Sequence, residues 1–105
     1  MNNDLFFMER AYKQALLGFN KDEIPVGAVV VYKNEIISEA HNESIVNKDP
    51  TAHAEIVAIR KAALKIGNYR LTNATMFVTL EPCLMCCGAL IHARFDKVIF
   101  STQDK

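Results

Sequence analysis

Apolar residues return every three or four positions at the start of the chain and then give way to unbroken apolar runs. The first pattern predicts an amphipathic helix over residues 4–17, which Gly18 can end. A nearly continuous β-branched run over residues 26–32 predicts a strand that is buried on both faces. After a polar turn, residues 35–40 predict a second strand, so the two strands form a hairpin.

The second half of the chain alternates between helical and extended patterns. A polar loop over residues 41–50 leads to an alanine-rich segment that is apolar on most sides and closes at Gly67. Pro82 stands where the first residue of a later helix tolerates proline. The expected elements are a helix over residues 52–66, a strand over 75–80, a helix over 83–93 and a strand over 97–101.

This order of elements, α-β-β-α-β-α-β, predicts an α/β fold. Because helices cross over after the second and third strands, we expect three layers, α/β/α, with helices on both faces of a mixed sheet. The chain has 105 residues, of which 50% are hydrophobic and 23% charged, and this suits one domain over residues 1–105. The fourth strand is the last element predicted before Lys105, so we expect the domain to be truncated at its carboxyl end.

Charge and hydropathy exclude several classes of protein. The 12 basic and 12 acidic residues balance, so we expect no broad basic surface for nucleic acid, only a local one. The longest apolar run, residues 24–32, contains Pro25 and Gly27 and is too short to span a membrane. The first residues lack the basic start and the cleavage site of a secretory signal, and we therefore expect a cytoplasmic protein.

Three cysteines cluster at Cys83, Cys86 and Cys87, an arrangement that suits a metal or redox site better than a disulfide framework. Cys83 and Cys86 stand at the expected start of one helix, and His53 stands at the expected start of another. These three side chains together offer the ligands of a zinc site that keeps one position open for water. Glu55 follows His53 closely enough to accept a proton from that water and pass it to a substrate nitrogen.

Each motif has a simpler interpretation when it is taken alone. A Cys-x-x-Cys pair is often a redox pair or half of a structural zinc site, and His-Ala-Glu is often only a capped helix start. Together, with Pro82 before the first cysteine, they match the zinc-deaminase signature, His-x-Glu followed by Pro-Cys-x-x-Cys. The signature spacing selects Cys86 rather than Cys87, which we expect to pack in the core. His41 and His92 have no ligand partners at a suitable spacing.

Four longer segments carry a resemblance that covers nearly the whole chain. They are residues 23–29, 40–42, 49–56 and 78–89. In these segments the sequence resembles the bacterial tRNA-specific adenosine deaminases of the cytidine deaminase-like superfamily. The zinc motif alone indicates only the superfamily, whereas its continuation through Ile91–Arg94, with Asp104 beyond the fourth strand, favours the tRNA-editing branch.

The resemblance implies a reaction as well as a set of ligands. It implies that His53, Cys83 and Cys86 bind zinc and that Glu55 is the proton shuttle. The implied reaction is hydrolytic deamination of adenosine to inosine at the wobble position of a tRNA anticodon, by a zinc-activated water. The alternatives are a deaminase of a free base or nucleoside, such as guanine or cytosine, and a zinc-binding fragment without catalysis.

The resemblance also implies contacts to RNA. Asn42 would hydrogen-bond the flipped adenine, Val26 would form an apolar wall, and the Ala54 main-chain amide would contact the base. Asp104 matches a position near the bound anticodon loop. The expected partners are a tRNA anticodon stem-loop and a second copy of the chain, in a homodimer. Members of the family continue into a fifth strand and carboxy-terminal helices, which is a second reason to expect truncation here.

Overall fold

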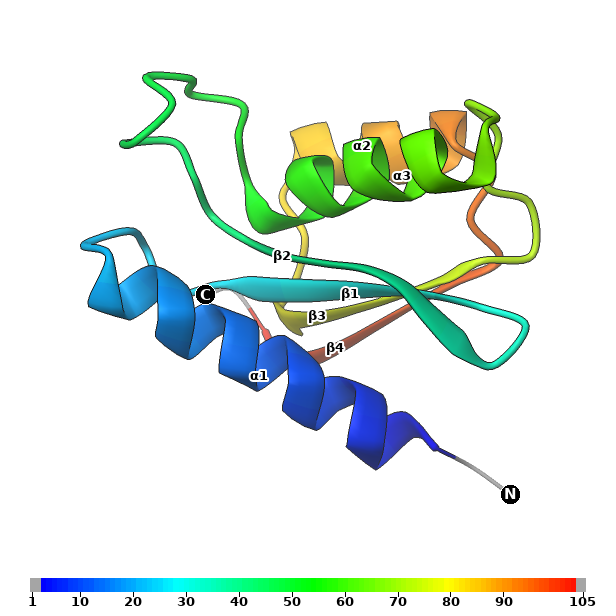
Figure 1. The fold of residues 1–105 in the computed structure, drawn as a ribbon, viewed down its shortest axis with the longest axis horizontal. Helices are drawn as coiled ribbons and strands as arrows, with labels where there is room; N and C mark the ends of the chain where they lie inside the picture. The colour runs from blue at the N-terminus through cyan, green and yellow to red at the C-terminus, as the bar shows by residue number, and fades with distance from the viewer. Residues whose placement is uncertain (1–2, 104–105) are drawn as a thin grey trace.

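The structure, a computed structural model, describes residues 3–103 and has three layers (Figure 1). Its elements are α1 (Asp4–Asn20), β1 (Gly27–Tyr32), β2 (Glu35–His41), α2 (Ala54–Ile66), β3 (Thr75–Leu80), α3 (Leu84–His92) and β4 (Lys97–Thr102). The predicted order of helices and strands is therefore confirmed. Every helix within the described residues is too short or too polar to cross a membrane.

The sheet is mixed, as predicted. The strand order within the described residues is β2-β1-β3-β4, in which β1 is antiparallel to both β2 and β3, and β3 is parallel to β4. Helix α1 covers one face of the sheet, and α2 and α3 lie side by side on the other (Figure 1). The predicted α/β/α fold is confirmed.

Strand β1 forms the centre of the core because it lies between two antiparallel neighbours and under helices on both faces. Ala28 and Val30 belong to the hydrophobic cluster beneath α2, whereas Val29 and Val31 belong to the cluster beneath α1. The predicted burial on both faces is confirmed. Gly27 opens the strand, and a Cβ atom at this position would collide with the α1 backbone. Only glycine therefore allows α1 to pack this closely.

Two predicted helix boundaries are wrong. Gly18 does not end α1, which continues to Asn20. A Cβ atom at Gly18 would lie 3.1 Å from the Cβ of His41, so the glycine serves close packing within the helix. Helix α2 begins at Ala54 rather than residue 52, because the N-cap His53 still has extended backbone angles. Its end is confirmed, since Gly67 adopts the left-handed conformation with φ 77°.

Helix α3 also begins later than predicted. Cys83 has extended backbone angles, φ −72° and ψ 173°, and is the N-cap. Its carbonyl oxygen accepts a hydrogen bond from the backbone N–H of Cys87 at 2.9 Å. Pro82 therefore precedes the N-cap and is not the first helical residue. This geometry leaves Cys83 outside the helix proper, next to the carboxyl end of β3.

Candidate zinc centre and active site

The starts of α2 and α3 bring three metal-ligating side chains together. The Nδ1 atom of His53 lies 3.6 Å from the Sγ atom of Cys83 and 3.6 Å from the Sγ atom of Cys86. All three ligand atoms lie within 4.8 Å of one another. His53 and Cys83 are the N-caps of their helices, while Cys86 projects from the first turn of α3.

The donor set suits zinc. One imidazole nitrogen and two cysteine sulfurs are ligands that Zn²⁺ prefers, and three protein ligands are typical of a zinc site with an open position. Cys86 is fully buried, whereas His53 and Cys83 are partly exposed and line a cavity of about 190 Å³. These residues therefore fit a zinc ion that a small molecule can approach from the cavity.

The surroundings of Cys86 favour its neutral thiol over the thiolate when no metal is bound. Its burial, followed by the nearby negative charge of Glu55 and a hydrogen bond with Cys83, raises the pKa of the Cys86 thiol far above its ordinary value. Zinc binds the thiolate, so metal binding would displace this proton. Low pH would for this reason weaken zinc binding.

Glu55 is a buried carboxylate in the first turn of α2. Its side chain lines the same cavity as His53 and Cys83, and the residue is only 4% exposed. Burial raises the pKa of Glu55, and the opposing effects of its backbone hydrogen bond and of His53 are smaller. A carboxyl group with a raised pKa holds a proton more readily than an ordinary one and can both take up and release it, as a general acid-base catalyst must.

Asn42 is held from two sides. Its Oδ1 atom accepts a hydrogen bond from the Ala54 amide at 2.7 Å, and its carbonyl oxygen accepts one from Nδ1 of His41 at 2.9 Å. The Oδ1 atom thus satisfies one of the amides that a helix leaves unpaired at its start. Asn42 and Val26 both line the cavity, whereas Ala54 is fully buried and its amide is already engaged. Asp104 lies outside the described residues.

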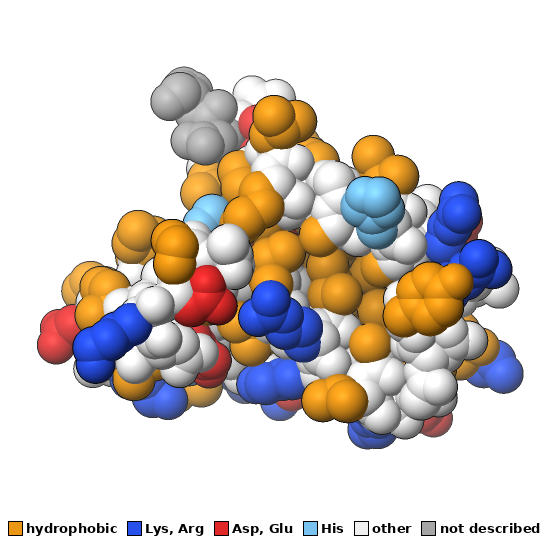
Figure 2. Space-filling model, turned by 90° about the horizontal axis from the view of Figure 1, so that it is seen from above, with side chains coloured by type: hydrophobic (Ala, Val, Ile, Leu, Met, Phe, Trp, Pro, Cys, Tyr) orange, Lys and Arg blue, Asp and Glu red, His pale blue; other side chains and the backbone are white. Residues whose placement is uncertain are grey.

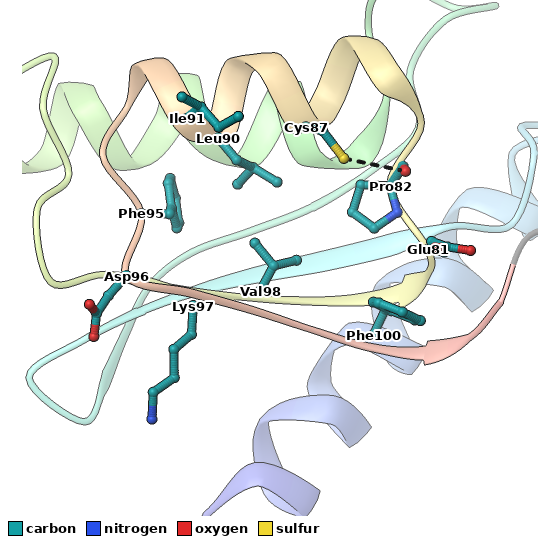
Figure 3. A pocket seen from close by; sticks show the side chains of 10 residues that line it. All are labelled: Glu81, Pro82, Cys87, Leu90, Ile91, Phe95, Asp96, Lys97, Val98 and Phe100. Atoms are coloured by element: carbon teal, nitrogen blue, oxygen red, sulfur yellow. Dashed lines mark hydrogen bonds between the residues drawn. The ribbon is translucent and has the colours of Figure 1, made fainter.

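Cys87 does not pack in the core, and this prediction is wrong. The residue is exposed, and its thiol donates to the carbonyl oxygen of Pro82 at 3.6 Å. It lines a separate hollow of about 350 Å³ between α3 and β4, which contains none of the three candidate ligands (Figure 3). Of the other histidines, His41 is buried and hydrogen-bonded, and His92 is exposed at the end of α3.

Two carboxylates near the site escaped the sequence analysis. Glu81 lines both the smaller cavity and the hollow beside Cys87. Glu23 is buried just before β1 and accepts two backbone hydrogen bonds from the loop between β2 and α2. Neither residue stands at a spacing that suggests a ligand. In the sequence, each is only a charged residue next to an apolar run, and this pattern does not reveal which groups the carboxylate contacts.

The chain was compared with known protein families. The family model for the cytidine and deoxycytidylate deaminase zinc-binding region matches residues 1–102. The chain belongs to this deaminase family. Because the family model describes a zinc-binding region, zinc is the metal that the three converging side chains would hold.

Curated relatives of this deaminase chain are tRNA-specific adenosine deaminases. The protein of Haemophilus influenzae is 52% identical over 94% of the chain and 56% of its own length. Those of Buchnera aphidicola subsp. Baizongia pistaciae and Aquifex aeolicus are each 48% identical, over 99% and 95% of the chain. The chain spans 64% of the Buchnera protein and 66% of the Aquifex protein. The resemblance found in the sequence is confirmed.

Two solved deaminase structures share the fold. One, from a study of A-to-I editing by tRNA:A34 deaminases at the wobble position, has a TM-score of 0.96 and 40% identity over 98% of this chain and 79% of its own. Guanine deaminase from Bacillus subtilis has a TM-score of 0.93 and 40% identity over 98% of this chain and 66% of its own. The fold therefore accommodates both tRNA editing and a free-base reaction.

Proposed function

We propose that this chain catalyses the hydrolytic deamination of adenosine to inosine at the wobble position of a tRNA anticodon. The observation that carries the proposal is a buried carboxyl group, Glu55, on the same cavity as two of three converging metal ligands. The tRNA substrate is supported by the 40–52% identity to several curated tRNA-specific adenosine deaminases.

His53, Cys83 and Cys86 would hold the zinc ion. When bound, zinc supplies a Lewis acid that makes water nucleophilic at neutral pH. The reaction adds the water oxygen to C6 of adenine, breaks the bond from C6 to the amino nitrogen and releases ammonia. One proton of the water goes to the ring nitrogen and the other to the departing amino group. Glu55 carries these protons, and its raised pKa suits it to release as well as accept them.

The remaining cavity residues bind and orient the base in this proposal. Because Oδ1 of Asn42 accepts from the Ala54 amide, its Nδ2 group is the end left to donate to the substrate. Val26, which is only 8% exposed, supplies an apolar wall. The Ala54 amide would contact the base only by sharing its hydrogen with Asn42. Asp104 is proposed to lie near the anticodon loop.

The substrate and the partners follow from the same proposal. A nucleotide in an anticodon loop is unpaired, so its base enters a cavity without the cost of opening a duplex. We propose the anticodon stem-loop as the RNA partner, a homodimer as the assembled form and the cytoplasm as the site of action.

Product analysis tests this function. Zinc-loaded protein is incubated with an anticodon stem-loop that carries adenosine at the wobble position, and inosine and ammonia are measured. The matched RNA carries the adenosine in the stem instead. We expect inosine only in the first RNA.

Free guanine provides the second arm, because the Bacillus subtilis guanine deaminase shares the fold at 40% identity. Ammonia from guanine alone would replace the tRNA proposal with a free-base deaminase. Free cytosine and free adenosine are tested in the same way, and no product from any of these substrates would favour the zinc-binding alternative.

A further inference from the structure

A buried carboxylate outside the metal centre ties two loops together. Glu23 lies between the end of α1 and the start of β1 and is only 5% exposed. Its Oε1 atom accepts the backbone N–H of Ile45 at 3.1 Å, and its Oε2 atom accepts that of Val46 at 2.8 Å. Burying a carboxylate is costly unless its oxygens are hydrogen-bonded, and here each oxygen has a donor.

Both loops adjoin residues that line the smaller cavity. Just after Glu23, the chain contributes Ile24 and Val26 to the cavity lining. The loop to which Glu23 is hydrogen-bonded begins after Asn42, which also lines the cavity, and it leads to His53. Figure 1 shows this loop rising from the end of β2 on the same side of the molecule as the carboxyl end of α1.

The antiparallel ladder between β1 and β2 ends next to these segments, where Gly27 pairs with His41. The backbone N–H of Asn42 donates to the carbonyl oxygen of Val26 at 3.3 Å, which is long for this type of bond. Hydrogen bonds to an ionised carboxylate are shorter and stronger than those between neutral groups. Beyond the end of the β1–β2 ladder, the Glu23 side chain therefore makes the stronger polar contacts between these two segments within the described residues.

We propose that Glu23 is a positioning residue, which holds the loop after Asn42 against the Ile24–Val26 segment and thereby influences the fit of the base. This inference rests on the proposed function, since it names a residue that shapes the same cavity. Glu23 does not line that cavity itself, so its role is to hold the residues that do.

Glu23→Gln tests the proposal with little change in size. The amide keeps one acceptor oxygen but turns a donor NH₂ group toward one of the two backbone N–H groups. One of the two hydrogen bonds is thus replaced by a repulsive contact between donors. Glu39→Gln is the matched control. Glu39 also accepts two hydrogen bonds, from the Nε and Nη2 atoms of Arg10 at 3.2 and 2.8 Å, but it joins α1 to β2 and does not line the cavity.

The first measurement is independent of activity. In nuclear magnetic resonance spectra of the zinc-loaded chain, we expect Glu23→Gln to move the Asn42 side-chain amide and the Ala54 backbone amide resonances, with zinc content unchanged. Glu39→Gln should leave both resonances in place. Unmoved resonances in Glu23→Gln, equal movement in the control or loss of zinc would overturn the proposal.

The second measurement is kinetic. On the anticodon stem-loop with wobble adenosine, we expect Glu23→Gln to raise KM about tenfold, which is the effect of weakening one good hydrogen bond between Asn42 and the base. We expect kcat to stay within about threefold. An unchanged KM would overturn the positioning role. If the unaltered chain does not deaminate this RNA, the proposed function fails, and the resonances alone then decide the role of Glu23.

A second variant covers the case in which Glu23→Gln does not fold. Glu23→Asp keeps both acceptor oxygens but shortens the side chain, so the loop must move toward the Ile24–Val26 segment to keep its bonds. We expect the same two resonances to move by a smaller amount. If they stay in place in a folded Glu23→Asp protein, the proposal is wrong.

Discussion

Two hollows near α3 differ in the side chains that converge on them. The smaller, about 190 Å³, collects polar groups from several elements, among them Asn42, Glu55 and two of the metal ligands. The larger, about 350 Å³, is lined mainly by apolar side chains of α3 and β4 (Figure 3). Figure 2, which shows the molecule from the side of α2 and α3, has hydrophobic side chains exposed among polar and basic ones. Convergent donor groups, rather than volume, identify the functional cavity.

Neighbouring cysteines divide between these environments. Cys86 is fully buried beside His53, whereas Cys87 is exposed and lines the larger hollow. Each residue of an α-helix is turned by about 100° from the one before, so neighbours in sequence need not share a face. The two cysteines therefore differ in chemistry because their side chains point toward different neighbours.

The largest expected effect is the loss of zinc when Cys86 is removed, with the removal of Cys87 as the comparison. Cys86→Ala should lower the metal content from about one ion per chain to nearly none, because two protein ligands hold zinc poorly. Cys87→Ala should keep its zinc. Elemental analysis of both purified variants decides the matter, and if only Cys87→Ala loses its metal, the ligand assignment is wrong.

Glu55→Gln should give the next largest effect. The amide cannot carry a proton, and general acid-base catalysis contributes roughly a hundredfold to ten-thousandfold to the rate. We expect kcat on the anticodon stem-loop to fall by about this factor while zinc content stays the same. Cys87→Ala serves as the control with unreduced activity. An unchanged kcat for Glu55→Gln would remove Glu55 from the mechanism.

The sequence predicted the fold well because its signals are local. The β-branched run of β1, the left-handed Gly67 and the alternation of helices and strands all depend on residues close in the chain. The ends of helices were predicted less accurately where contacts with distant residues affect them. Gly18 looked like a helix end, yet it lies inside α1, where the absence of a side chain leaves room for His41.

The site was predictable only where a motif fixes it. The sequence positions of His53, Cys83 and Cys86 predict a shared metal site. Their meeting also depends on extended N-cap geometry at Cys83, which puts this residue outside the helix. Helical spacing from Cys83 therefore could not tell which way Cys87 faces. The hydrogen bonds that Glu23 accepts from distant backbone amides leave no pattern in the sequence at all.

Two variants of Asn42 should separate its role as acceptor for the Ala54 amide from its proposed role as donor to the base. We expect their effects on stability and KM to be intermediate in size. Asn42→Ala leaves the buried Ala54 amide without an acceptor, which costs about 1–3 kcal/mol of unfolding free energy. Asn42→Asp keeps the acceptor oxygen but loses the donor that we assign to the base. We expect thermal unfolding to show a larger loss of stability for Asn42→Ala, and both variants to bind zinc and to show raised KM. Loss of zinc in either variant would mean that Asn42 supports the metal centre itself.

The smallest expected effect comes from one substitution made in each hollow. Val98→Thr changes a β4 side chain of the larger hollow that is 37% exposed, and the new hydroxyl can reach water. We expect its unfolding free energy to stay within about 0.5 kcal/mol of the unaltered chain, with zinc content and activity unchanged. Val26→Thr places the same hydroxyl in the smaller cavity, where the residue is only 8% exposed, and should cost about 1–3 kcal/mol and raise KM. Denaturant unfolding and kinetics on the stem-loop measure both effects. If Val98→Thr impairs the reaction as much as Val26→Thr, the larger hollow takes part in function, and the contrast drawn between the two hollows fails.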